Sequence, residues 1–407
     1  MGFLNYVWRK LTPTKRLEMT SGKFELVFFD SIYRAMYLTG LSQCDRGFYL
    51  IYRYAIKCMI FIFVLSEVWF FAVAKNSKDR IDNINVTLQH LFTYYRYWTM
   101  MKNIDIYKKL AKAMESQYFD TSTPGRQLIL QYWINNNDRY FKILITLGTF
   151  CLAVWYPCQL FDDVEYNLVA GLKIPFNYQT PSRYAATYLV AVIFFHYTSY
   201  FTMVNDSIMQ VHLMQMLCQY DVLADCFENI LVDCRLNKNN FHTNEAFIQK
   251  YIKRLGDLVK QHNMILSNTS ELRKILSVPM LVQLGGNAMV ICFSAYRVTM
   301  AVGVEFLKSL LHLAYSMIML FILCKWCDEI KVQVSGLRIG DAVYFSGWEE
   351  MAKVPGVRAR LMMVAARSNW PLALTAGGIY DLSLRSYTTL IKTSYSCLTL
   401  LLQSQKD

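Results

Sequence analysis

Charged residues are scarce in this sequence. Asp, Glu, Lys and Arg make up 18% of the 407 residues, whereas soluble domains have roughly 25%. Hydrophobic residues make up 54% and aromatic residues 15%, which excludes a protein that is surrounded by water alone. Acidic residues number 30 against 42 basic ones, so the net charge is +12. This excess of basic residues fits an anionic membrane surface better than a nucleic acid.

Motifs of catalytic and metal sites are also missing. The six histidines form no HExxH pattern, and the chain has no GxSxG, Walker A or dinucleotide-binding fingerprint. The 11 cysteines are scattered, mostly in apolar segments where a free thiol behaves as a small hydrophobic group. Cys324 and Cys327 form a CxxC without a second pair. We therefore expect no enzyme, no catalytic residue, no cofactor, no metal site and no disulfide framework.

Long apolar runs are what the sequence has instead. A helix needs roughly 20 predominantly apolar residues to cross a membrane. Seven segments of about that length are predicted to cross, at residues 54–74, 83–101, 140–161, 184–217, 276–296, 306–326 and 384–402. The second is interrupted by His90 and Arg96, which are expected to face protein rather than lipid. The sequence thus predicts an all-α integral membrane protein with seven transmembrane helices.

The distribution of basic residues predicts the orientation of these helices. Lys and Arg accumulate in short cytosolic loops, and residues 1–45 lack an apolar segment typical of a signal peptide. We therefore expect a cytosolic N-terminus and an extracellular C-terminus. With that orientation most of the basic loop residues lie inside, and the outside receives only Lys75, Lys78, Arg80, Lys173, Arg183, Arg297, Lys308 and Lys406.

The sequence carries four further signals in and near its connecting segments. Apolar residues recur at helical spacing between the fourth and fifth crossings, so the membrane helices are expected to extend into the cytosol and to bundle there. The outer loop at residues 162–183 contains Pro and Gly, which favours a folded lid over a helix. Gly377 and Gly378 predict a break before the last helix. Asn85 heads a glycosylation sequon near an outer helix end, whereas the sequons at Asn205 and Asn268 are expected to stay unmodified.

The last predicted helix has an unusual composition for a crossing. Its polar residues fall at spacings of three and four and form one stripe, made of Thr388, Lys392, Tyr395, Thr399 and Gln403. The stripe either packs against the other helices or faces water in a pore. A single helix cannot enclose a pore, so the second alternative requires an oligomer. Leu398 and Leu402 form an apolar ridge beside the stripe, suited to a hydrophobic constriction.

The same C-terminal region resembles a known family. The run RSNWPLALTAGGIYDLSLRSYTTLIKTSYSCLTLL at residues 367–401 is similar to the C-terminal signature of insect odorant receptors. KIPFNYQTP in the outer loop, HNMILSNTSEL before the fifth crossing and AVYFSGW after the sixth support the resemblance along the chain.

The resemblance implies an odour-tuning subunit that binds a small volatile odorant. In the family such a subunit assembles with a common co-receptor into a tetramer, and the tetramer forms a non-selective cation channel around a central pore. The resemblance implies a place in the plasma membrane of olfactory sensory neurons, in contact with membrane lipid and with no nucleic acid. The cytosolic helix extensions would then form an anchor bundle between subunits.

The expected organisation is a single seven-helix domain over residues 1–407. Residues 1–46 form the cytosolic N-terminus, and residues 47–230 hold the first four crossings with the ligand pocket. Residues 231–383 hold the cytosolic helices and crossings five and six, and residues 384–407 form the pore-lining seventh helix. Carried over from the family, the gate falls on Leu398 and Leu402, whereas periodicity aims Tyr395 and Thr399 at the pore axis. The two answers differ by one residue, or about 100° of helix rotation.

The family's ligand site lies among the outer halves of crossings two, three, four and six. On crossing three, Gly148, Cys151 and Trp155 share a helix face, where a small residue beside a tryptophan can shape an apolar cavity. The residues expected to face them are Leu91, Tyr94, Val192, His196, His312 and Tyr315. Core packing is the alternative for each of them. Two other functions stay open: a gustatory-type ligand-gated channel that acts without the co-receptor, and a seven-helix receptor coupled to a G protein.

Overall fold

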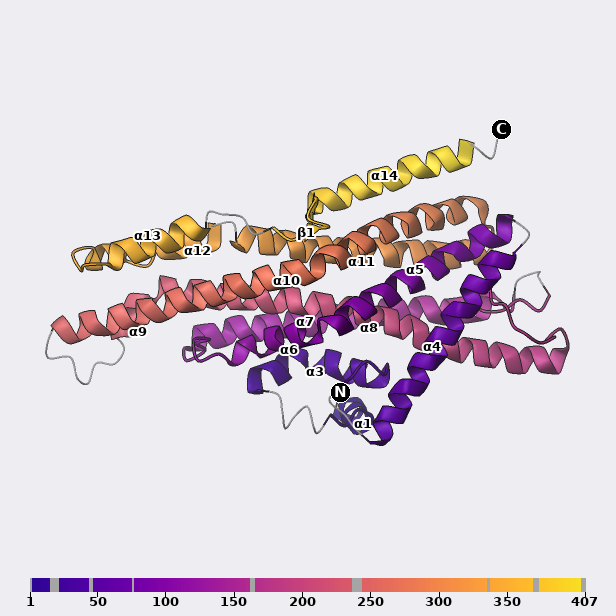
Figure 1. The fold of residues 1–407 in the computed structure, drawn as a ribbon, viewed down its shortest axis with the longest axis horizontal. Coiled ribbons are helices and arrows are strands. Elements are labelled where there is room, and N and C mark those ends of the chain that lie inside the picture. Colours follow the sequence, from indigo (N-terminus) through magenta and orange to yellow (C-terminus); the bar gives the residue numbers. More distant parts are fainter. Residues whose placement is uncertain are drawn as a thin grey trace.

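Long helices run side by side along one axis of the molecule (Figure 1). The computed structural model describes residues 2–14, 22–43, 47–74, 77–161, 165–235, 244–334, 337–368 and 373–403. The N-terminal part of the chain forms two helices that lie beside the bundle, α1 (Gly2–Leu11) and α3 (Lys23–Leu38). Cys44 lies outside the described residues, and the ten other cysteines are free.

Seven longer helices correspond to the seven predicted crossings. They are α4 (Phe48–Val73), α5 (Ser77–Lys102), α7 (Pro124–Cys158), α8 (Pro181–Glu228), α10 (Asn244–Met300), α11 (Val304–Val334) and α14 (Leu384–Gln403). Helices α7 and α8 each begin with a proline at the first position, where no backbone donor is needed. The hydroxyl of Thr123 accepts from the backbone N–H of Arg126 and caps α7.

Five of these helices, within the described residues, are long and apolar enough to span a membrane: α4, α7, α8, α10 and α11. Helix α5 has 26 residues and α14 has 20, so both have the length, but neither reaches that apolarity. Polar groups such as Gln89, His90 and Arg96 in α5 account for the difference. The side chains of His90 and Arg96 are buried in protein, as the sequence predicted.

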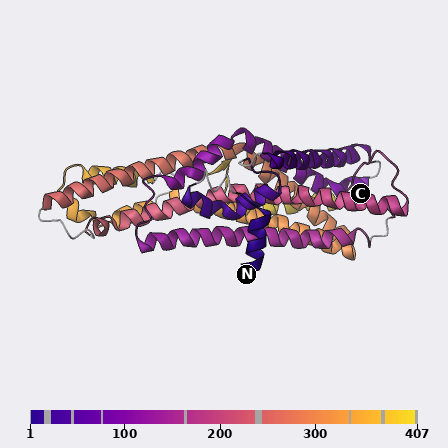
Figure 2. The same cartoon turned by 90° about the horizontal axis from the view of Figure 1, so that it is seen from below.

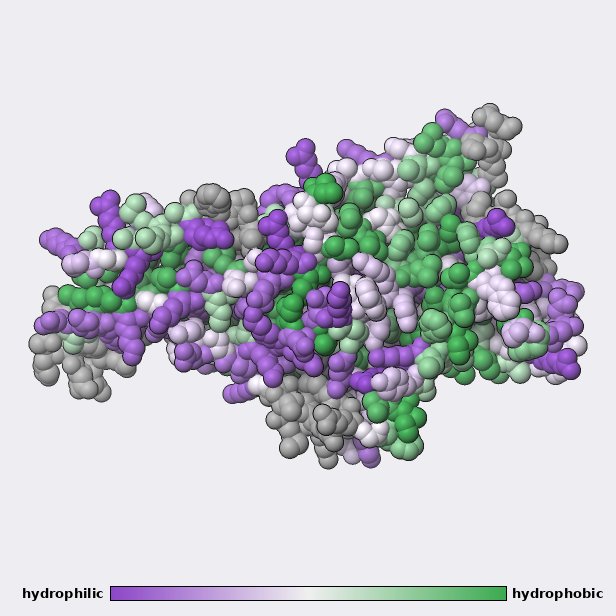
Figure 3. All heavy atoms as spheres, in the orientation of Figure 1, coloured by the Kyte–Doolittle hydropathy of each residue, from purple (hydrophilic) through white to green (hydrophobic). Residues whose placement is uncertain are grey.

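One end of the molecule is polar and carries the short helices. Helices α8 and α10 extend well beyond the apolar region toward α9 (Ile230–Arg235), α12 (Leu337–Tyr344), η3 (Trp348–Met351) and α13 (Val357–Ser368). Figure 3 shows hydrophilic residues over this end and hydrophobic residues over the half that holds α4, α5, α11 and α14. The helical extensions predicted for the loop after α8 are therefore present, and the flat, elongated shape is clear in Figure 2.

A buried arginine joins three segments near this polar end. Arg126 at the start of α7 is 0% exposed. Its guanidinium donates to Asp225 at 2.8 Å and to Asp233 at 2.5 Å, and also to Asp120 at 2.8 Å in the segment that follows α6 (Ile104–Lys112) and η1 (Ala113–Glu115). Arg254 on α10 bonds to Asp120 as well. These ion pairs tie α7, α8, α9 and α10 together.

The outer loop and the break before α14 have the predicted character. Residues 165–180 contain no helix, and Val169 in this loop is fully buried, so the segment is a folded lid over the helix ends. Gly377 and Gly378 have φ values of +63° and +74° and turn the chain between β1 (Thr375–Ala376) and β2 (Tyr380–Asp381), two antiparallel strands. The N–H of Gly377 donates to the carbonyl of Ser277 at 2.8 Å and fixes this turn to α10.

Candidate ligand-binding site

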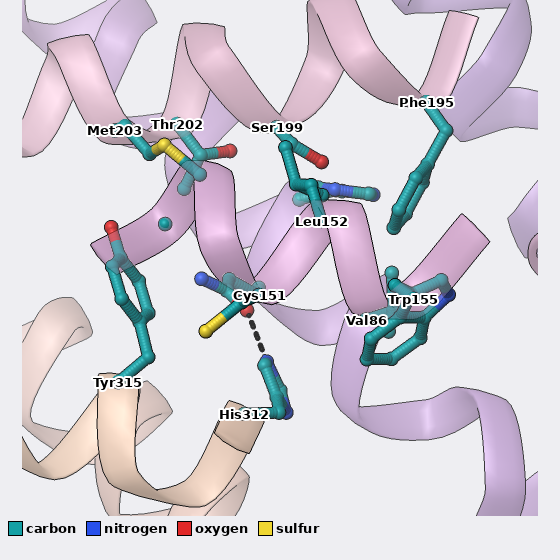
Figure 4. Close-up of a pocket in the computed structure, with 13 residues that line it drawn as sticks. Val86, Cys151, Leu152, Trp155, Phe195, Ser199, Thr202, Met203, His312 and Tyr315 are labelled. Atoms are coloured by element: carbon teal, nitrogen blue, oxygen red, sulfur yellow. Dashed lines mark hydrogen bonds between the residues drawn. The ribbon is translucent and has the colours of Figure 1, made fainter. Parts of the chain in front are cut away.

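A cavity of about 60 Å³ lies between helices α5, α7, α8 and α11 (Figure 4). Its walls are mainly apolar and aromatic, with a few hydroxyl, amide and imidazole groups. The residues that line it are Val86, Gln89, His90, Gly148, Cys151, Leu152, Trp155, Phe195, Ser199, Thr202, Met203, His312 and Tyr315. Each helix contributes residues three or four apart, which is the spacing of one helix face. The wall is therefore built by the inward faces of four helices.

Two aromatic rings form one side of the cavity. Trp155 and Phe195 lie with ring centroids 5.8 Å apart at an angle of 33°. The indole N–H of Trp155 donates to the carbonyl of Val169 in the lid at 2.8 Å. Because Val169 is fully buried, the lid holds the indole in a fixed orientation. The edge of His312 meets the face of Trp155 at 5.8 Å and 77° and continues the aromatic wall.

The imidazoles of the cavity wall make hydrogen bonds within the protein. Nε2 of His312 lies 3.0 Å from Oε1 of Gln89, and Nδ1 lies 3.1 Å from the hydroxyl of Ser294 on α10. His90 is 2.8 Å from the carboxylate of Glu67 on α4, and both side chains are buried. These pairs join α4, α5, α10 and α11 around the cavity.

The hydroxyl of Tyr315 differs from these groups. Tyr315 is 5% exposed, and its hydroxyl is buried without a hydrogen-bond partner in the part of the chain that the structure describes. Figure 4 shows this oxygen directed toward Thr202 and Met203. The hydroxyl of Thr202 already donates to the carbonyl of Thr198 at 3.1 Å. Among the described residues, the hydroxyl of Tyr315 is therefore a buried polar group of the wall that has no hydrogen-bond partner.

Gly148 makes room for the side chain of Met203 in the cavity wall. A Cβ atom at this position would lie 2.4 Å from Cε of Met203 and 3.3 Å from Cε2 of Tyr315. The missing side chain lets Met203 from α8 lie directly against α7. Any larger residue at position 148 would displace the Met203 side chain.

Five of the nine residues predicted to contact a ligand line this cavity: Gly148, Cys151, Trp155, His312 and Tyr315. The other four lie outside it: Leu91, Tyr94, Val192 and His196. Leu91 and Tyr94 are exposed, and His196 is exposed and hydrogen-bonded to Tyr156 at 3.0 Å. The ligand contacts themselves stay predictions.

A one-residue error in phase explains the missed positions on α5. The cavity face of α5 carries Val86, Gln89 and His90, whereas the predicted Leu91 and Tyr94 lie on the neighbouring face. The intramembrane His90, already expected to face protein, marks the correct face. On α8 the correct face carries Phe195, Ser199, Thr202 and Met203, and no comparable charged residue identifies it.

Helix α14 packs along α10 and α11 with one face. Ser394 donates to the carbonyl of Ala288 on α10 at 3.1 Å, and Leu398 on the same face is 8% exposed. The polar stripe points away from the chain, with Thr388, Lys392, Tyr395 and Gln403 exposed and Thr399 half-buried. The burial of Leu398 disagrees with the prediction that it lines a pore, because a pore between chains is lined by residues that their own chain leaves uncovered. Leu402 is half-buried.

Asn85, the first residue of the sequon, is buried, whereas a glycosylated asparagine has to be accessible. Its side chain is 1% exposed, and Nδ2 donates to the hydroxyl of Ser294 at 3.2 Å. A glycan would be attached to this same nitrogen. The packing of Asn85 beside the cavity is therefore incompatible with glycosylation in this conformation. Among the described residues, no group of histidine, cysteine and acidic side chains is arranged to hold a metal ion.

These features define a multi-pass helical membrane protein with a mainly apolar cavity between its helices. The sequence pattern of the family described as 7tm Odorant receptor matches residues 76–395, and the chain belongs to this family. The resemblance stated from the C-terminal motifs is thus confirmed, and the protein is an insect odorant receptor with a role in olfaction.

Known relatives agree with this assignment. The chain is 24% identical to odorant receptor 94a of Drosophila melanogaster over 319 residues, which cover 74% of this chain and 77% of the relative. It is 22% identical to odorant receptor 10 of Aedes albopictus over 74% of this chain and 78% of the relative. The solved structure of the insect olfactory receptor OR5 from Machilis hrabei in complex with eugenol has a TM-score of 0.76 and 16% identity, and the match covers 93% of this chain and 98% of that one. This last likeness confirms the all-α membrane fold.

Proposed function

We propose that this receptor is an odour-tuning subunit that binds a small volatile in the cavity between α5, α7, α8 and α11. The volatile opens a non-selective cation channel formed with co-receptor subunits in a heterotetramer. The observation that carries the proposal is the mainly apolar cavity between the four helices, with the indole of Trp155 in its wall held by a hydrogen bond to Val169 of the lid. Pockets of this kind favour apolar ligands with few polar contacts. The receptor acts in the plasma membrane of olfactory sensory neurons, surrounded by lipid.

The proposed topology has seven crossings, with α5 and α14 added to the five apolar helices. The N-terminus is then cytosolic and the C-terminus extracellular. Within the single domain, residues 1–46 precede the membrane and residues 47–230 hold α4 to α8, of which α5, α7 and α8 line the cavity together with α11. Residues 231–383 contribute the polar end, which serves as the anchor between subunits, and residues 384–407 contain the pore helix. The hydrophilic surface over α9, α12 and α13 supports a cytosolic place for this end.

The exposed stripe on α14 supports a pore at the subunit interface. Thr388, Lys392, Tyr395 and Gln403 would be costly against lipid, and polar groups of membrane helices usually face protein or water. We infer that this face, with Thr399 at its margin, forms this subunit's part of the pore wall. The ridge of Leu398 and Leu402 then packs on α10 and α11 when the stripe faces the pore.

Helix α10 connects the cavity to the pore helix. Its Ser294 bonds to His312 in the cavity wall, and its Ala288 accepts the hydrogen bond from Ser394 of α14. A ligand that favours one position of α10 would therefore favour one position of α14. A ligand shifts such an equilibrium only through its difference in affinity for the two states. The open state is expected to be the one in which the cavity holds the volatile more tightly.

Co-expression with the co-receptor tests this function. A panel of volatiles is expected to evoke inward cation current in cells that express both chains and none in cells with the co-receptor alone. Current from this chain alone would favour the gustatory-type alternative. A C-terminal tag accessible only after permeabilisation would favour the G-protein-coupled alternative. Silence across a wide panel, with the protein at the cell surface, would contradict the proposal.

Shrinking the cavity at Gly148 is expected to reduce potency. In Gly148→Ala the new methyl group pushes Met203 into the cavity, and overpacking of this kind costs about 1–3 kcal/mol. The concentration of volatile needed for half-maximal current should rise about tenfold. The second change Met203→Ala should restore the response, because it removes the side chain that the methyl group displaces.

The matched control is Gly285→Ala on α10. A Cβ atom there meets nothing within 4 Å, so the response should stay unchanged. Equal responses of Gly148→Ala and Gly285→Ala would contradict the assignment of the ligand to this cavity.

A further inference from the structure

We propose that the cavity selects neutral aromatic volatiles that carry one oxygen, and that this oxygen bonds to the hydroxyl of Tyr315. The inference rests on the proposed function for the location of the ligand and adds its chemical class. It is carried by the buried Tyr315 hydroxyl, which has no partner in the described part of the chain, and by the composition of the surrounding wall.

The wall has no charged group available to an ionic ligand. The cavity wall carries two imidazoles, and His90 is already paired with the carboxylate of Glu67. The ammonium of Lys308 lies 5.0 Å from the ring centroid of Trp155, and it is paired with Glu305. His312 has both ring nitrogens in contact with Gln89 and Ser294. An acid or an amine would have to enter as an ion without a partner, which is strongly unfavourable in a buried site. The ligand is therefore neutral.

The shape and polarizability of the wall favour a flat ring. Trp155 and Phe195 present tilted aromatic surfaces, and aromatic pairs are stabilised in offset and edge-to-face arrangements. Sulfur atoms of Cys151 and Met203 complete the wall, and sulfur makes favourable contacts with aromatic rings. An aromatic ligand can contact both kinds of surface. A saturated ring of the same size gains less from either.

The cavity volume limits the ligand to a single small ring. It measures about 60 Å³, and an apolar cavity of roughly 150 Å³ holds benzene. The additional space must come from a side chain that moves. Met203 is the suitable candidate, because its unbranched side chain has several rotatable bonds and lies against Gly148. A ring with one short substituent fits this limit.

The Tyr315 hydroxyl selects for an oxygen atom in that substituent. A buried hydroxyl without a partner is unfavourable, and a ligand acceptor removes this penalty. The Tyr315 hydroxyl is buried, and Figure 4 places Met203 beside it, against Gly148. The movement of Met203 that enlarges the cavity therefore also uncovers the hydroxyl for a ligand. A hydrocarbon of the same shape fills the space but leaves the hydroxyl without a partner. The site should therefore discriminate between the two, as sites with buried polar groups do.

Benzaldehyde and styrene test this inference because they differ only in a C=O group against a C=CH₂ group. Benzaldehyde should activate the receptor with the co-receptor at about tenfold lower concentration than styrene. In Tyr315→Phe the response to benzaldehyde should weaken about tenfold, whereas the response to styrene should stay within about twofold. Cyclohexanecarbaldehyde, which has the oxygen but not the aromatic ring, should be weaker than benzaldehyde on the unmodified receptor.

Tyr94→Phe is the matched control, because Tyr94 is an exposed tyrosine outside the cavity and should change neither response. The same ligand pairs are compared by the rise in melting temperature of the purified chain, which reports binding without gating. If the volatiles evoke no current but benzaldehyde still raises the melting temperature more than styrene does, the channel function is contradicted and the ligand class is supported. Equal effects of Tyr315→Phe on benzaldehyde and styrene in both measurements would overturn the inference.

Discussion

Replacement of Arg126 by methionine is expected to prevent most of the protein from folding. Arg126 is 0% exposed and bonds to Asp120, Asp225 and Asp233. The variant would leave three carboxylates close together, with Arg254 paired to Asp120 and Asp233. Removing one partner of a buried ion pair costs about 3–5 kcal/mol. We expect the lower part of this range, because the three carboxylates keep some contact with water.

The melting temperature of the detergent-purified protein and the height of its monodisperse size-exclusion peak measure this effect. Arg126→Lys should be intermediate, since an ammonium group keeps the charge but cannot reach three carboxylates with a planar fork. Lys109→Met is the control. Lys109 pairs with Glu271 but is 60% exposed, and surface pairs contribute little. If Arg126→Met proves as stable as Lys109→Met, this result would contradict a structural role for the ion pairs of Arg126.

The stability contributed by this cluster of ion pairs depends on pH. Burial raises the pKa of Asp120, but hydrogen bonds with Ser122 and the charges of Arg254 and Arg126 outweigh it, so the pKa is lowered from its ordinary value of 3.8. A carboxyl group with a lowered pKa stabilises the fold above its unfolded-state pKa, and this contribution is lost as the pH falls through the folded-state pKa. The ion pairs of Asp120 are therefore intact at neutral pH.

The positions of most helices were predictable from the sequence, whereas the ion pairs of Arg126 were not. Apolar runs and glycine turns are local signals, so α4, the start of α8 and the Gly377 turn lie close to where they were expected, whereas α7 begins 16 residues before the predicted residue 140. The partners of Arg126 on α8 and α9 lie 99 and 107 residues away along the chain. No local pattern indicates which distant carboxylates will meet one arginine.

Rotation of the helices about their own axes was the weakest part of the prediction. On α5 the choice of Leu91 instead of His90 moved the expected contacts off the cavity face. On α14 the preferred gate residue Leu398 packs on its own chain, whereas the neighbouring stripe is exposed, and the pore-lining role of either stays a prediction. In both helices the alternatives differ by one residue, or about 100°. In lipid, apolar residues suit the outside as well as the inside, so hydrophobicity alone does not fix the inward face.

Polar residues are the better guide to that face, and Arg96 shows why. It lies on α5 among buried groups, where it bonds to Asp206 of α8 and Gln283 of α10, and to Thr93 at 3.1 Å. Gln283 also donates to Asp206 at 3.3 Å. A charge in the membrane interior is retained only with such partners. The position of Arg96 therefore fixes how α5, α8 and α10 face one another below the cavity.

Asp206→Ala is expected to destabilise the receptor by about 3 kcal/mol or more, because it leaves the guanidinium of Arg96 buried without a counter-charge. Little protein should reach the cell surface. Asp206→Asn keeps an acceptor oxygen and should lose less. The double variant Arg96→Met with Asp206→Leu should recover folding, since a buried pair can often be replaced by apolar residues without loss.

Surface labelling and the melting temperature of the three variants decide whether the pair acts through its charge. If the double variant remains as unstable as Asp206→Ala, the specific hydrogen bonds are required, and the charge balance is not the cause. If it folds, its response to volatiles shows whether the link from α5 to α10 also serves gating. Gln283 and Ser294 both lie on α10, so a receptor that folds and binds but no longer opens would place the coupling in this polar contact.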